Sequence, residues 1–287
     1  MTRQEFLHIT MGITTLSSLA SFASDLKGSE KPMPVLFLGH GSPMNGIEDN
    51  AYTKSWESLG KTLPLPKAVL CISAHWLTKG TLVTAMEKPK TIHDFGGFPK
   101  ALFDVQYPAP GSPEVAKAVQ SEIHSIQVHA DHEWGLDHGT WSVVKRMYPD
   151  AKVPVLQLSI DYSKGPQYHY SLAKELNALR RKGILIIGSG NMVHNLGIME
   201  WQKGENYGFD WAKEMDASFK KLIQSKEHSK LINYEQMGPS AKLAIPTPDH
   251  YYPLLYTLGL QEDKDHLRIF NDSVSMGSIS MTSLQIG

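Results

Sequence analysis

The sequence predicts a single-domain α/β sandwich, in which a central, largely parallel or mixed sheet is flanked by helices. Two observations carry this prediction. Short apolar runs alternate with longer amphipathic stretches along the chain, and several of the runs end at glycine or serine. The chain has 287 residues, of which 41% are hydrophobic and 20% charged, as is typical of a globular protein with one large core.

Four short runs are continuously apolar, which is typical of strands buried on both faces of a sheet. We therefore predict central strands at residues 35–38, 68–72, 153–158 and 183–187. The runs are followed by loops that begin at Gly39, Ser73 and Gly188. In an open α/β sheet, such loops gather at the carboxyl edge of the strands, where ligands usually bind.

Amphipathic stretches with apolar residues at helical spacing separate these runs. They predict helices over residues 112–123, 140–148, 167–181 and 207–226, and a short apolar helix after the turn at residues 247–253. The loop at residues 107–113 is rich in proline and glycine. We expect this loop to form a wall of the site.

Charge and cysteine content exclude two classes of function. The formal net charge is -1 and the chain has no basic run, so nothing indicates a nucleic-acid partner, and a small molecule is the expected ligand. Thirteen histidines accompany a single cysteine, Cys71. A disulfide within the chain and a thiolate zinc cluster are therefore excluded, and a metal would have to be held by nitrogen and oxygen.

Residues 1–30 have the layout of an export leader. Arg3 supplies a positive start, residues 9–22 are mostly apolar or small, and a small-x-small pattern precedes Ser24. Gln4 stands where a twin-arginine signal would have its second arginine. We expect a periplasmic or exported protein whose catalytic domain spans residues 31–287; the alternative is a cytoplasmic protein with a disordered N-terminus. No other segment is long enough to form an integral membrane span.

Four histidines follow strands or turns where loops meet, and none lies within a predicted helix: His40, His75, His194 and His250. A neutral imidazole is the commonest protein ligand for zinc and also binds ferrous iron. The pattern therefore predicts one shared metal site. His138 lies close to a predicted helix start, where the positive end of the helix dipole favours a neutral ring that accepts a proton, as a general base must.

Several motifs together resemble those of the 4,5-DOPA extradiol dioxygenase family, a group of class III extradiol dioxygenases. The resemblance runs from about Pro34 to the C-terminus, with the motifs in the family's order. They are Gly39-His40-Gly41-Ser42-Pro43, Ser73-Ala74-His75-Trp76, His93-Asp94-Phe95-Gly96-Gly97-Phe98-Pro99, Tyr107-Pro108-Ala109-Pro110-Gly111, Asp137-His138-Gly139-Thr140-Trp141, Gly188-Ser189-Gly190-Asn191 with His194-Asn195, and Asp249-His250-Tyr251.

This resemblance implies an activity and a role for individual residues. The activity is the opening of a DOPA-like catechol ring with O2, which needs one divalent metal, Zn2+ or Fe2+, per subunit. The implied metal ligands are His40, His75, His194 and His250, and the implied acid/base is His138. No glutamate lies in these motifs, so the carboxylate of the better-known two-histidine iron site is missing. The pocket residues would be His93, Phe95, Phe98 and Tyr107, although Phe95 and Phe98 equally suit packing within a loop.

Two other functions fit the same residues. Zinc held by imidazoles beside a base also activates water, as in a zinc hydrolase. A fourth histidine ligand would instead close the site, as in a protein that binds a metal or a phenolic ligand without catalysis. Activity towards catechols under air separates these alternatives. The sequence makes no prediction about the oligomeric state.

Overall fold

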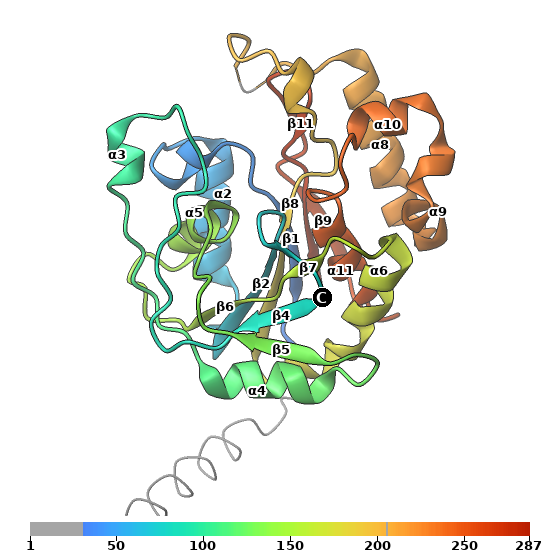
Figure 1. The fold of residues 1–287 in the computed structure, drawn as a ribbon. Helices are drawn as coiled ribbons and strands as arrows, with labels where there is room; N and C mark the ends of the chain where they lie inside the picture. Colours follow the sequence, from blue (N-terminus) through green and yellow to red (C-terminus); the bar gives the residue numbers. More distant parts are fainter. Residues whose placement is uncertain (1–30, 205) are drawn as a thin grey trace, which may run out of the picture.

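The computed structural model describes residues 31–204 and 206–287, and this part of the chain contains a mixed sheet of six strands. The strand order is β6-β2-β8-β1-β12-β9, with bounds Val155–Gln157, Ala68–Ser73, Ile184–Gly190, Val35–Gly39, Ser283–Ile286 and Leu267–Phe270. Strands β6, β2, β8 and β1 run parallel, and β12 runs antiparallel to both of its neighbours. The predicted α/β fold and its four strands are confirmed (Figure 1).

One of these strands was placed wrongly, because β6 lies at the edge of the sheet and not at its centre. Pro154, which precedes β6, has no N–H to donate and is typical of an edge. Three pairs of very short strands lie outside this sheet: β3 (Leu77–Thr78) with β7 (Ile160–Asp161), β4 (Thr81–Thr84) with β5 (Val128–Asp131), and β10 (Val274–Ser275) with β11 (Ile279–Ser280).

Helices cover both faces of the sheet, as Figure 1 shows. One face is covered by α2 (Ala51–Thr62) and α5 (His138–Met147), together with the short α3 (Lys100–Phe103). The opposite face is covered by the helices α4 (Pro113–Glu122), α6 (Pro166–Glu175), α7 (Asn177–Arg181), α8 (Asp210–Gln224), α9 (His228–Ile232), α10 (Pro239–Ala244) and α11 (Tyr252–Gly259). Short 3-10 turns lie at η1 (Pro43–Gly46), η2 (Leu196–Ile198) and η3 (Tyr234–Met237). The predicted helices are confirmed, except that the stretch 167–181 is divided at Leu176.

Alternate residues of the strands enter two separate hydrophobic cores. In β1, Val35 and Phe37 pack with α6, α8 and α11, whereas Leu36 and Leu38 pack with α2 and α5. Strand side chains alternate between the faces of a sheet, so a strand that is apolar throughout stabilises both layers. Each fully buried aliphatic side chain contributes roughly 1.5–3 kcal/mol.

Among the described residues, no helix is long and apolar enough to cross a membrane. The expected export leader, residues 1–30, lies outside the described residues.

Candidate active site

The carboxyl ends of three parallel strands bring two histidines together. His40 follows β1 and His75 comes two residues after β2. These two strands are not direct neighbours in the sheet, because β8 lies between them. The end of β8 is built from Ser189 and Gly190, so no large side chain of this strand keeps the two imidazoles apart.

The rings of His40 and His75 face each other through their Nε2 atoms, which are 3.2 Å apart. Their other nitrogens are occupied. The Nδ1 of His40 lies 3.0 Å from Ser189 Oγ, whose hydroxyl donates to Gly139 O, and the Nδ1 of His75 lies 3.3 Å from Asp94 Oδ2. A neutral imidazole carries one proton, so with its proton on Nδ1, facing these oxygen atoms, each ring would present an Nε2 lone pair to the other.

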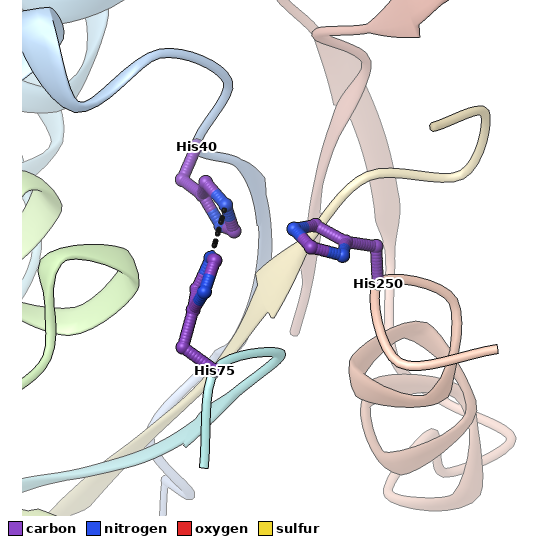
Figure 2. A group of neighbouring side chains, drawn as sticks. All are labelled: His40, His75 and His250. Atoms are coloured by element: carbon purple, nitrogen blue, oxygen red, sulfur yellow. Dashed lines mark hydrogen bonds between the residues drawn. The ribbon is translucent and has the colours of Figure 1, made fainter. Parts of the chain in front are cut away.

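His250 approaches the same point from the opposite side (Figure 2). It precedes α11, and its carbonyl accepts a 2.9 Å hydrogen bond from the Asn191 N–H just after β8. Its Nδ1 is hydrogen-bonded to the carboxylate of Asp249. Three histidines, His40, His75 and His250, each offer one nitrogen atom as a possible metal ligand, and these three atoms lie within 4.8 Å of one another. We call these three imidazoles the convergent set.

His194 was expected in this set but occupies a different position. Its ring stacks on that of His250, with centroids 3.5 Å apart and planes 7° from parallel. Parallel stacked rings direct their nitrogen lone pairs side by side, and not at a common point. His194 nevertheless lines the same cavity, and it forms a second group of possible ligands with Asp249 and His250, again within 4.8 Å of one another. The structure therefore brings all four histidines together.

His138 stands beside the convergent set as the first residue of α5. The helix is capped by Asp137, whose carboxylate accepts from the Thr140 N–H at 3.0 Å. The carboxylate of Asp94 accepts twice from His138, from its backbone N–H at 2.9 Å and from Nδ1 at 3.0 Å. The Nε2 of His138 is therefore left with its lone pair, as the predicted acid/base role requires.

Burial keeps the clustered imidazoles neutral. Burial lowers the pKa of His75 to about 3 and that of His194 to about 4, and it lowers the pKa values of His40 and His250 well below their ordinary value. Burial by itself would raise the pKa of Asp94, but hydrogen bonds from His138 and the nearby histidines lower it to about 2. The site at neutral pH therefore combines neutral nitrogen donors with an ionised carboxylate behind them.

The histidines line a cavity of about 340 Å³, which is within the usual range of about 300–1,000 Å³ for small-molecule sites. Phe95 and Phe98 line the cavity, as predicted. They also pack against the core beneath α2 and α5, and their rings meet edge to face at 5.5 Å. These two residues therefore have both of the roles that the sequence left open.

The structure places two of the predicted pocket residues outside the cavity lining. Tyr107 is buried in the core, where its hydroxyl donates to Tyr148 O at 2.9 Å. The ring of His93 lies 6.0 Å from that of Trp141, tilted by 58°, and its Nε2 is hydrogen-bonded to Val105 O at 2.9 Å. The loop at residues 107–113 packs away from the cavity lining, so its predicted role as a wall is wrong. Two residues of this loop, Tyr107 and Ala109, are buried in the core instead.

Residues that the sequence analysis passed over complete the site. Asp94 and Asp249 each lie next to a histidine in the chain, and each holds a ring nitrogen of the cluster. Ligand histidines commonly donate their second nitrogen to a carboxylate, so an aspartate beside a histidine in a motif was an available signal. Trp201 and Leu196 also line the cavity, and no pattern in the sequence distinguished them.

Comparisons with known proteins agree with this geometry. The family model described as the catalytic LigB subunit of aromatic ring-opening dioxygenase matches residues 34–284. A protein of Escherichia coli named 4,5-DOPA dioxygenase extradiol is 48% identical over 273 residues, which cover 94% of this chain and 100% of the relative. A protein of the same name from Beta vulgaris is 36% identical over 259 residues, which cover 86% of this chain and 96% of the relative.

A crystal structure of an uncharacterised protein from Escherichia coli K12 superimposes with a TM-score of 0.76 at 44% identity. The superposition covers 89% of this chain and 100% of the chain in that crystal structure. The matched region contains all five histidines of the cavity. The chain belongs to the LigB family of aromatic ring-opening dioxygenases, whose members use a metal, and is an oxidoreductase of the extradiol type.

Proposed function

We propose that this protein opens the ring of a DOPA-like catechol beside one of its hydroxyl groups and incorporates both atoms of O2. The observation that carries this proposal is the convergence of His40, His75 and His250, whose Nδ1 atoms are held from behind. The proposed substrate class comes from the names of two relatives, each of which is called 4,5-DOPA dioxygenase extradiol.

The donor set fits a divalent metal. With both protons on Nδ1, the two Nε2 lone pairs, 3.2 Å apart, would repel unless a cation lay between or beside them. His40, His75 and His250 would hold this ion, and three nitrogen ligands leave positions open, as a catalytic site requires. Asp94 lies on the Nδ1 side of His75, so it orients this ligand from outside. We propose Fe2+ as the working ion, because zinc has no redox chemistry.

The bound ion would supply a binding point for both catechol oxygens and a redox partner for O2. The chain's own residues handle the protons. His138 removes the second hydroxyl proton through Nε2, while Asp94 stabilises the charged ring at Nδ1. Phe95 and Phe98 contact the ring and exclude water. His194, which is neutral and lies against His250, is the alternative proton-transfer group.

Metal loading of variants tests the ligand set. His40→Ala, His75→Ala and His250→Ala should each lose most of the bound Fe2+ when it is titrated anaerobically. His132→Ala is the matched control, because His132 is exposed and does not line the cavity. Full occupancy in the His75→Ala protein would contradict the assignment. If His194→Ala also loses the ion, the set contains four histidines.

We propose export for the localisation, from the leader pattern of residues 1–30. A reporter that works only outside the cytoplasm, fused after residue 30, should be active. An inactive reporter together with an intact N-terminus on the full-length protein would support the cytoplasmic alternative.

A further inference from the structure

We propose that this site selects catechols whose ring substituent is uncharged and apolar, and that Trp201 is a residue that determines this specificity. This inference rests on the proposed function. DOPA would still enter the cavity, but its carboxylate would stay in solvent and add nothing to binding. The argument depends on an apolar wall, the charges that line the cavity, and the anchoring of the wall.

The apolar wall consists of five side chains that line the cavity: Leu196, Met199, Trp201, Met276 and Ile279. It comes from the segment after β8 and from the β10–β11 hairpin. Two of its members remain open to solvent, with Leu196 56% and Trp201 62% exposed. Large apolar side chains left uncovered at the entrance of a cavity are typical of a surface that a ligand covers.

The charges in the cavity do not favour a carboxylate. The described residues that line it include neither Lys nor Arg, and Asp94 is the one acid among them. Asp94 already accepts from His138 and faces His75. Moving a carboxylate from water onto the apolar wall, which carries no opposite charge, is unfavourable, whereas an alkyl group gains from burial.

The apolar wall is held in place by backbone hydrogen bonds. The Asn195 N–H donates to Ser278 O at 3.2 Å, and the Glu200 N–H donates to Met276 O at 2.8 Å. Met276 N–H in turn donates to Gly204 O at 3.1 Å. These bonds connect both ends of the segment that carries Leu196 and Trp201 to the hairpin. The exposed side chains are therefore presented by an anchored backbone, as a specificity surface requires.

Matched substrates test the proposal on the Fe2+-loaded protein. The panel is catechol, 4-ethylcatechol, dopamine, DOPA and 3-(3,4-dihydroxyphenyl)propionate. We expect the KM for 4-ethylcatechol to be at least about tenfold below that for the propionate. The carboxylate that stays in solvent keeps the alkyl chain of the propionate off the apolar wall, and a methylene in an apolar pocket changes selectivity by roughly 10- to 200-fold. Dopamine should have a KM no higher than that of DOPA. A lower KM for the propionate or DOPA than for their uncharged or decarboxylated partners would overturn the inference.

Variants of the wall show whether Trp201 is responsible. In Trp201→Ala, the kcat/KM ratio of 4-ethylcatechol to catechol should fall by about tenfold, and Trp201→Phe should restore much of it. Leu65→Ala, which changes an exposed apolar residue outside the cavity, should keep the wild-type ratio. An unchanged ratio in Trp201→Ala would contradict the assignment. If wild type cleaves no catechol at all, the proposed function itself has failed, whereas cleavage without this selectivity rejects only the further inference.

Discussion

Each histidine of the convergent set has an oxygen atom behind its Nδ1. Ser189 serves His40, Asp94 serves His75 and Asp249 serves His250. These partners determine which nitrogen carries the proton and how the ring is turned. The Nε2 atoms are thereby prepared as ligands before any ion binds, which reduces the cost of ordering the site.

Asp94→Asn tests this preparation, because the amide keeps the shape of the carboxylate but removes its charge. We expect the affinity for Fe2+ to fall by about 10- to 100-fold, the usual effect of removing an outer partner of a ligand histidine. Anaerobic metal titration measures it. Asp104→Asn, at an exposed ion pair with Lys100, should bind the ion as wild type does. Wild-type affinity in Asp94→Asn would show that the carboxylate does not support His75.

His138→Ala tests the proton-transfer assignment. The variant should keep its metal, while kcat falls by about 100- to 10,000-fold, as is typical for loss of a general acid or base. Single-turnover kinetics and metal analysis measure the two effects. His194→Ala provides the comparison, because both rings line the cavity and neither belongs to the convergent set. A large loss of rate in His194→Ala with a normal rate in His138→Ala would transfer the role to His194.

At the scale of elements, β8 determines how closely α11 and His250 approach the sheet. A side chain at Gly188 would have its Cβ 2.3 Å from Pro253 O, and one at Gly190 would have it 2.2 Å from His250 O. Both contacts are with backbone atoms, which cannot move aside easily. Glycine at these two positions therefore allows α11 and His250 to lie against β8.

Gly188→Ala should consequently lower both stability and metal binding. Overpacking of this kind typically costs about 1–3 kcal/mol, and displacement of α11 would move His250. Chemical denaturation and Fe2+ titration measure the two losses. Gly165→Ala is the control, because nothing lies within 4 Å of a Cβ at that position. A Gly188→Ala protein as stable as wild type would show that α11 adjusts without strain.

The sequence was most informative where residue type and position follow from simple rules. Apolar runs such as residues 183–187 predict buried strands because both faces of the strand are covered, and a histidine after such a strand lies at the carboxyl edge. The stacking of His194 on His250 is a matter of ring orientation, which a one-dimensional pattern does not contain. The burial of Tyr107 was missed for a related reason. A loop rich in proline and glycine can pack into the core or face a ligand, and its composition is the same in both cases.

At the scale of the whole molecule, the layer that contains α6 and α11 includes a buried histidine unrelated to the site. The ring of His169 lies 4.2 Å from that of Tyr252, and its Nδ1 is 3.2 Å from the Tyr256 hydroxyl. Burial lowers the pKa of His169 to about 4 from an ordinary value of 6.5. The unfolded chain therefore binds a proton at a higher pH than the folded chain does.

This difference predicts a loss of stability in acid. The contribution of His169 is fully present above about pH 6.5 and is lost as the pH falls towards about 4, with a limit of roughly 3 kcal/mol at 1.36 kcal/mol per pH unit. His169→Phe keeps an aromatic ring but cannot titrate. Urea unfolding of the metal-free proteins at pH 7 and pH 5 should show a smaller acid loss in the variant. Equal losses in both proteins would assign the effect to other groups.

The central claim, that the convergent histidines support ring opening of a catechol by O2, is tested most directly by oxygen uptake under 18O2. Protein loaded anaerobically with Fe2+ should consume one O2 per catechol and yield a ring-opened product that contains two labelled oxygen atoms before exchange with water. The same protein loaded with Zn2+, and the His75→Ala variant, should consume none. A wild-type protein that binds Fe2+ through these histidines yet leaves both catechol and O2 unconsumed would contradict the account.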